Sequence, residues 1–136
     1  METNRENESF LIGQSSALID HSLLDIEVCS SLKGEVMGRP YCTLLIENQT
    51  ERVLGIHLSL DKPDYRSAIS VLRECFRCYG KLPEQILIDG GKEFQHPQFD
   101  AVLNYFGIVK KSPSNFAFKA KLERIFGKIS QFLSKL

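Results

Sequence analysis

The order of hydrophobic periodicities along the chain constrains its fold more than any other feature. Three runs in which apolar and polar residues partly alternate come first, and this period of two is typical of half-buried strands. Stretches with apolar residues at every third or fourth position follow, interleaved with two short apolar runs. This order predicts β-β-β-α-β-α-β-α, which is a mixed sheet with helices on its faces.

The expected elements can be placed from these periods and from the turn residues between them. We expect strands over 17–29, 41–47, 52–60, 85–89 and 107–110, and helices from Pro63 to Tyr79, over 97–106 and over 119–136. Turn residues join the first three strands, which therefore form an antiparallel meander, whereas strands joined through helices are parallel. The predicted fold class is α/β.

The length of 136 residues fits one domain, because it can bury a single core but not a second independent one. Residues 1–16 are mostly polar and aperiodic, so we expect an N-terminal tail followed by one domain over 17–136. Hydrophobic residues make up 43% and charged residues 25%, which excludes a wholly disordered or fibrous chain. No apolar run approaches the roughly 18 residues of a membrane span, so we expect no membrane insertion.

Net charge and cysteine content give no functional signal of their own. Lys and Arg total 17, as do Asp and Glu, so any claim of nucleic-acid binding depends on local arrangement. Cys75 and Cys78 form a CxxC pair, but no second pair or paired histidines follow at zinc-site spacing. Reduced, partly buried thiols are therefore the favoured interpretation, with a zinc or redox role as the alternative.

Three acidic residues occupy positions where a charge is locally unfavourable. Asp20 interrupts the apolar face of the first strand, Asp89 ends a buried strand, and Glu123 lies beside the apolar stripe of the last helix. Carboxylates near a core are costly unless they are paired or bind a metal, and Mg²⁺ and Mn²⁺ prefer such oxygen ligands. In the predicted topology the first strand is central and the strand ending in Asp89 is its neighbour, so the two aspartates can approach each other.

Each acid also has a structural interpretation. Asp89 could cap the turn that Gly90 begins, and Asp20 could be a surface acid on an edge strand. Glu123 could form an ordinary helix-surface pair with Lys119 or Arg124. Only the combination of the three residues favours a metal site.

Five segments, in order, resemble successive blocks of the catalytic core of DDE transposases and retroviral-type integrases, most closely the Mu-like and TnsB-like branch. The segments are ALIDHSLLDIEV, GRPYCTLLIE, VLGIHLSL, LPEQILIDGGKEF and KAKLERIFGKI. They span nearly all of the chain from residue 17 onward. The resemblance implies a ribonuclease H-like fold for residues 17–136.

The resemblance also implies a site and a reaction. Asp20, Asp89 and Glu123 match the three family acids that bind two Mg²⁺ or Mn²⁺ ions. The implied function is metal-dependent DNA strand transfer, in which a 3′ end is nicked and then joined to target DNA. A catalytically silent domain of the same fold, acting in DNA binding or assembly, is the alternative, and another nuclease of this fold is a third.

The implied partners are DNA, as transposon ends and target, together with further copies of the chain and accessory transposition proteins. The implied location is the prokaryotic cytoplasm, at the nucleoid when the protein acts. No end-recognition module accompanies the core, so we expect an excised catalytic domain or a fragment that works with other subunits.

The sequence departs from the family pattern at three positions. Gly90 stands where Asn is common, and Ala120 replaces the Gly expected before the glutamate. Glu51 stands where relatives often carry an arginine in the turn between the second and third strands, so a salt bridge from that turn is in doubt. None of these changes removes a predicted metal ligand.

Several neighbouring residues are candidates for supporting roles. Cations gather near the last helix and could bind DNA phosphates or simply be solvated: Lys110, Lys111, Lys119, Lys121, Arg124 and Lys128. Phe116 and Phe118 could stack on bases or fold onto the core. His21 is interpreted as a packed or surface histidine, and Asp25, Glu27 and Glu93 as structural acids that compete with the triad.

Overall fold

A five-stranded mixed sheet organises the fold. In the computed structural model, which describes residues 15–113 and 117–136, the strand order is β5-β4-β1-β6-β7. The strands are β1 (Ser16–Leu23), β4 (Tyr41–Glu47), β5 (Val53–Ser59), β6 (Gln85–Leu87) and β7 (Val109–Lys111). β1, β4 and β5 are antiparallel neighbours, whereas β6 is parallel to β1 and to β7. The predicted meander, the parallel strands and the central first strand are confirmed.

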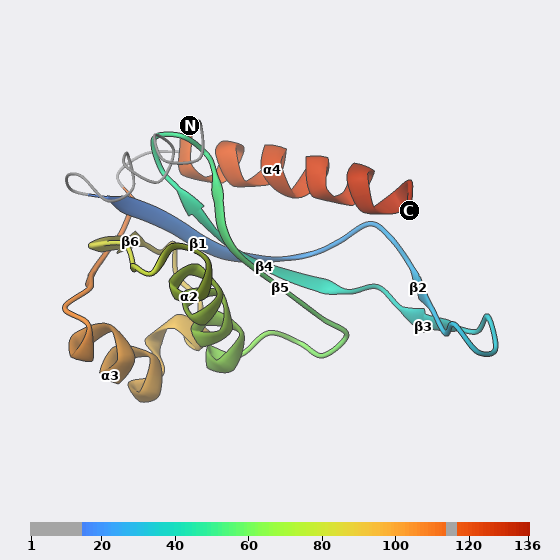
Figure 1. Cartoon of the computed structure of the whole chain (residues 1–136), viewed down its shortest axis with the longest axis horizontal. Helices are drawn as coiled ribbons and strands as arrows, with labels where there is room; N and C mark the ends of the chain where they lie inside the picture. Colours follow the sequence, from blue (N-terminus) through green and yellow to red (C-terminus); the bar gives the residue numbers. More distant parts are fainter. Residues whose placement is uncertain (1–14, 114–116) are drawn as a thin grey trace.

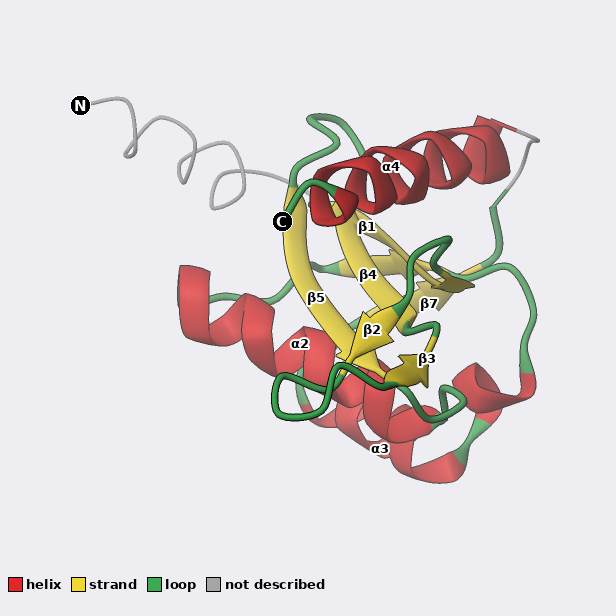
Figure 2. Cartoon of the chain, turned by 90° about the vertical axis from the view of Figure 1, so that its right-hand side faces the viewer, coloured by secondary structure: helices red, strands yellow, loops and turns green. Residues whose placement is uncertain are grey.

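Helices cover both faces of this sheet (Figures 1 and 2). α2 (Tyr65–Tyr79), the 3-10 helix η1 (Lys92–Gln95) and α3 (Pro97–Tyr105) lie on one face, and α4 (Ala117–Ser134) crosses the other. Alternation along β1 sends Leu18 into the core under α4 and Ile19 into the core under α2. The same alternation directs Asp20 to the α4 face and His21 to the α2 face.

The start of α2 differs slightly from the prediction. The helix begins at Tyr65 rather than Pro63, because the Asp64 side chain accepts hydrogen bonds from the first turn and Ser67 completes a capping box. It ends at Gly80, whose φ of 68° is the left-handed conformation that glycine adopts without strain. The predicted stop at Gly80 is confirmed.

The expected strand over 17–29 is wrong in its second half. β1 ends at Leu23, and β2 (Val28–Cys29) pairs instead with β3 (Val36–Gly38) in a separate two-stranded arm (Figure 1). β4 begins at Tyr41, as predicted, directly after Pro40. Pro40 has no N–H to donate to a strand partner. The sequence did not predict η1 either.

α2 packs unusually close to β5. A Cβ atom at Gly55 would lie 2.3 Å from the main-chain oxygen of Val71, so only glycine fits at this crossing.

The CxxC cysteines are free thiols, with Cys75 buried and Cys78 exposed. Within the described residues, no helix is both long enough and apolar enough to cross a membrane.

Candidate active site

Asp20 lies in the middle of β1, and Asp89 lies in the loop that follows the neighbouring strand β6. Asp20 is half-buried in β1, opposite Leu44 of β4, and Asp89 follows β6 by two residues with 38% of its side chain exposed. β6 runs parallel to β1 and its last paired residue, Leu87, stands opposite Leu18. The chain after β6 therefore passes the part of β1 that carries Asp20.

Asp20 has an unfavourable charge environment. Burial raises the pKa of its carboxyl group most, and the negative charges of Asp89 and Glu93 raise it further. The main-chain N–H of His21, which donates to Oδ1 at 2.8 Å, and the charge of Lys119 lower this pKa. The net shift is upward, so positive charge placed here would stabilise the ionised carboxylate.

Lys119 supplies one positive charge at this position. Its Nζ lies 3.2 Å from Asp89 Oδ2, so the first turn of α4 contacts the loop after β6. Both side chains are partly exposed. An ammonium group thus stands beside one of the two aspartates.

Glu123 does not lie close to Asp20 and Asp89. It is exposed on α4, and the second carboxylate whose charge reaches Asp20 is that of Glu93. Lys119 and Glu123 are four positions apart in the sequence, so the two share one side of the helix about one turn apart. Throughout residues 15–113 and 117–136, no three His, Cys, Asp or Glu side chains are close enough together to hold a metal ion.

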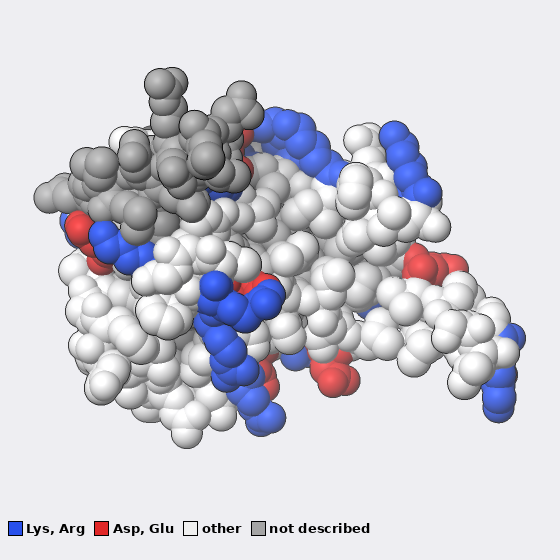
Figure 3. Space-filling view, in the orientation of Figure 1, with Lys and Arg blue, Asp and Glu red and all other residues white. Residues whose placement is uncertain are grey.

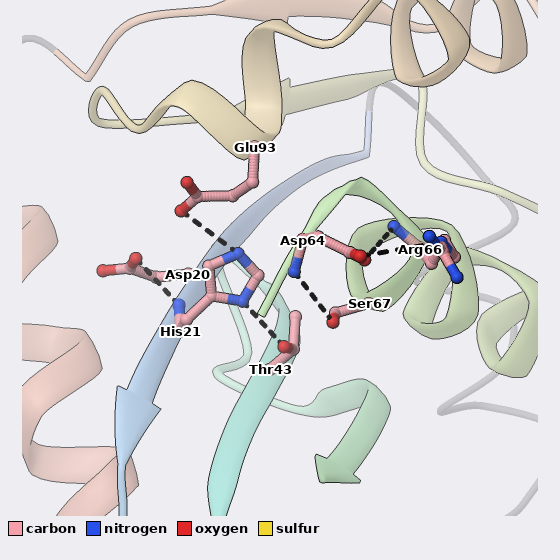
Figure 4. Close-up of polar contacts among 7 residues, drawn as sticks. All are labelled: Asp20, His21, Thr43, Asp64, Arg66, Ser67 and Glu93. Atoms are coloured by element: carbon pink, nitrogen blue, oxygen red, sulfur yellow. Dashed lines mark hydrogen bonds and ion pairs between the residues drawn. The ribbon is translucent and has the colours of Figure 1, made fainter. Parts of the chain in front are cut away.

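His21 and Glu93 meet on the α2 side of β1 (Figure 4). His21 Nε2 lies 3.3 Å from Glu93 Oε1, and Nδ1 is hydrogen bonded to Thr43 Oγ1 at 2.7 Å. The imidazole stacks on Phe94 with ring centroids 4.7 Å apart. Burial lowers the pKa of His21, and the nearby charge of Glu93 partly opposes this shift. The sequence anticipates a packed histidine here, but not its contact with Glu93.

Most of the predicted DNA-binding cations have partners within the fold. Lys121 Nζ donates to the main-chain oxygen and the side chain of Asn48, and Arg124 forms an ion pair with Glu51. Lys119 pairs with Asp89, and Lys110 pairs with Asp100. Of the six predicted cations, Lys111 and Lys128 are therefore the two whose side chains have no partner in the described part of the chain. Figure 3 shows Lys and Arg side chains scattered over one face rather than joined in a continuous basic surface.

The salt bridge from the β4–β5 turn is present, although the sequence placed it in doubt. Glu51 pairs with Arg124 of α4 and has a φ of 60°, which is uncommon for a residue other than glycine. The turn therefore orients the first half of α4. Phe118 is buried in the core beneath α4, and Phe116 lies outside the described residues.

Comparisons with known proteins support this assignment of the fold. The family described as the TnsB C-terminal domain matches residues 18–78, a stretch that contains Asp20 but neither Asp89 nor Glu123. The integrase catalytic core domain of HTLV-2, solved in complex with magnesium, superposes with a TM-score of 0.67 at 17% identity, covering 92% of this chain and 72% of that one. The chain therefore has the ribonuclease H-like fold of integrase catalytic cores.

Two other integrase chains share this fold to different extents. A chain of the simian T-cell lymphotropic virus intasome gives a TM-score of 0.69 at 16% identity, covering 92% of this chain and 41% of that one. The catalytic core of BIV integrase gives 0.52 at 15% identity, covering 82% and 64%. No curated protein sequence matches the domain.

Proposed function

We propose that this domain is the metal-dependent catalytic core of a DNA transposase or integrase, which nicks a 3′ end and joins it to target DNA. One observation carries the proposal. Asp20 lies on β1, and Asp89 lies in the loop after the parallel neighbour β6, close enough that its charge raises the pKa of the Asp20 carboxyl group.

The donor set at this position suits hard divalent cations. Asp20 and Asp89 offer only oxygen atoms, and the Lys119 ammonium already places positive charge beside Asp89. Asp20 and Asp89 would share two Mg²⁺ or Mn²⁺ ions, and Glu123 would complete one coordination sphere. Such ions stabilise the charge on the attacking and leaving oxygens of a phosphodiester.

The chain's own residues would prepare this site. His21 N–H orients the Asp20 carboxylate through its hydrogen bond to Oδ1. Lys119 would leave Asp89 when the cations bind, and its ammonium could then pair with a DNA phosphate. Glu123 follows on the same side of α4, where a long exposed side chain can turn toward the aspartates.

The partners of this domain follow from the same proposal. DNA, as transposon ends and target, would bind beside α4, where Lys128 is exposed. The similarity to an intasome chain supports a homo-oligomer as the active assembly, together with accessory transposition proteins. Action at the nucleoid of a prokaryotic cytoplasm fits this role.

A second function is favoured by one observation. Lys119 already neutralises Asp89, and Glu123 stands apart from both aspartates among the residues that the structure describes. A catalytically silent domain that binds DNA or contributes to transpososome assembly would keep this arrangement permanently.

Strand joining in vitro distinguishes the two functions. A labelled duplex oligonucleotide with a free 3′ hydroxyl would be incubated with supercoiled plasmid and Mn²⁺, and covalent transfer of label would be measured. Asp20→Asn, Asp89→Asn and Glu123→Gln should each abolish Mn²⁺-dependent joining while retaining DNA binding in a gel-shift assay. Activity retained by all three variants would overturn the triad, and an inactive wild-type domain that binds DNA would favour the silent function.

A further inference from the structure

The segment over 88–95, which carries Asp89, runs along an edge of β1 that has no strand partner in the described chain. β6 pairs with β1 only as far as Leu18 and Leu87. Asp20 and His21 lie beyond this last pair on β1, so ladder hydrogen bonds from β6 do not fix the segment relative to Asp20. A main-chain hydrogen bond from Ile88 N–H to Lys111 O holds the start of the segment to β7, and side-chain contacts connect the rest of it to β1.

His21 makes the contacts that reach from β1 to this segment. Its side chain is only 9% exposed, and its ring stacks on Phe94 at an interplanar angle of 4°. Nε2 lies 3.3 Å from Glu93 Oε1. Nε2 is buried and has no other partner in the described chain, so the Glu93 carboxylate is the group that can satisfy it.

The remaining contacts fix the orientation of the imidazole. Thr43 stands opposite His21 on β4, and its hydroxyl is 2.7 Å from Nδ1. When the Thr43 hydroxyl donates to Nδ1, the neutral ring carries its proton on Nε2 and presents it to the Glu93 carboxylate. The same residue donates its main-chain N–H to Asp20 Oδ1 at 2.8 Å. His21 therefore contacts Asp20 through its backbone and the 88–95 segment through its ring.

The segment itself is shaped for this contact. Gly91 has a φ of 94°, and a Cβ atom there would lie 2.9 Å from Glu93 Oε1 and 3.1 Å from the Phe94 ring. Glycine at this position thus lets Glu93 turn back toward β1. At the far end, Lys110 Nζ donates to the main-chain oxygen of Phe94 at 3.1 Å.

We propose that His21 is a positioning residue that acts through Glu93 to hold the Asp89 segment beside Asp20. The inference deepens the proposed function and rests on it, because the distance between the two aspartates determines whether they share a cation. Thr43 sets the tautomer, and Phe94 sets the plane of the ring. The His21–Glu93 contact gives Glu93 a role distinct from that of the Asp20, Asp89 and Glu123 triad.

Substitutions that differ only in reach test this role. His21→Asn keeps an amide near the Nδ1 position but cannot reach Glu93, whereas the longer His21→Gln can place an amide N–H near the Nε2 position. Glu93→Gln removes the charge from the other side of the contact. Glu27→Gln, at an exposed residue just before the β2–β3 arm, is the matched charge control.

Two measurements on the whole chain separate the inference from the proposed function. Mn²⁺ titration calorimetry should show affinity about 10–100-fold weaker in His21→Asn and Glu93→Gln, the range usual for residues that orient metal ligands. The double variant should bind no more weakly than the weaker single variant, since both act through one contact. His21→Gln should recover part of the affinity, and Glu27→Gln should bind as wild type does.

Hydrogen exchange without metal provides the independent readout. Amides of 88–95 should exchange faster in His21→Asn and Glu93→Gln than in wild type or Glu27→Gln. Unchanged exchange in both variants would overturn the positioning role, as would unchanged Mn²⁺ affinity when wild type binds, or additive effects in the double variant. A wild-type chain that binds no Mn²⁺ would instead overturn the proposed function, and the exchange data alone would then decide the role of His21.

Discussion

Lys119 Nζ lies 3.2 Å from Asp89 Oδ2, so the first turn of the last helix contributes a cation to the loop after β6, where the charges of both residues act on the pKa of Asp20. A lysine ammonium and a divalent cation cannot occupy the same side of one carboxylate. The contact therefore places Lys119 in direct competition with the proposed metal ions.

Removing this ammonium should strengthen metal binding. We expect Lys119→Met to bind Mn²⁺ several-fold more tightly than wild type, because Asp89 no longer has to exchange an internal partner. The melting temperature should change little, since partly exposed ion pairs contribute about 0–1 kcal/mol. Titration calorimetry and thermal melting measure the two effects against Lys128→Met, which removes a cation from the same helix without touching Asp89. Equal or weaker Mn²⁺ binding by Lys119→Met would exclude competition.

Asp20→Asn should stabilise the fold in a pH-dependent way. Burial is the main reason that the folded-state pKa of Asp20 lies above its ordinary value, so ionisation of this carboxyl group opposes folding. This destabilisation is absent at a pH below the pKa that Asp20 has in the unfolded chain. It reaches its full size as the pH rises through the pKa that Asp20 has in the folded protein. The variant should therefore melt at a higher temperature than wild type at pH 7, and the difference should vanish at acidic pH.

Asp25→Asn is the control for this pH dependence, because the Asp25 side chain is 96% exposed. Its melting temperature should follow that of wild type across the same pH range. A difference between Asp20→Asn and wild type that does not change with pH would contradict the burial of an ionised Asp20.

Two glycine substitutions should have opposite effects on stability. Gly55→Ala should destabilise the domain by about 1–3 kcal/mol, since its Cβ would collide with the backbone of α2 at Val71. Gly127→Ala should stabilise it by up to about 1 kcal/mol, because this helical glycine has no neighbour within 4 Å of the added atom. Urea unfolding measures both changes. A neutral Gly55→Ala would mean that α2 and β5 are farther apart than described.

The cations without internal partners in the described chain should dominate DNA binding by α4 and β7. Lys128→Ala and Lys111→Ala should each weaken binding to duplex DNA and reduce the slope of log affinity against log salt by about one unit for each phosphate that is no longer neutralised. Lys62→Ala, in the β5–α2 connection, should leave the slope unchanged. Fluorescence anisotropy at several salt concentrations measures the slope. An unchanged slope for both Lys128→Ala and Lys111→Ala would place the DNA elsewhere.

Much of the architecture could be read from periodicity. Burial imposes the alternation around Leu18 and the three- to four-residue spacing of Leu122, Ile125 and Phe126. These residues are buried in the two cores under α2 and α4, as their pattern predicts. The sequence also predicted the topology that brings the segment with Asp89 next to the strand with Asp20, because β6 is the parallel neighbour of β1.

Other features depend on contacts that periodicity does not encode. The arm formed by β2 and β3 breaks a run that reads as one strand, because Pro40 and the register of β1 with β4 determine where pairing stops. The His21–Glu93 contact joins residues 72 positions apart and lies beyond the last residue pair of β1 and β6. The one sequence signal for Glu93 is its position four residues after Asp89.

Anomalous diffraction from crystals grown with MnCl₂ tests the central claim most directly. The proposed function predicts Mn²⁺ peaks within coordinating distance of both the Asp20 and Asp89 carboxylates, with Glu123 turned toward them and Lys119 displaced from Asp89. A structure in which Lys119 remains paired with Asp89 and no Mn²⁺ lies at either aspartate would contradict it.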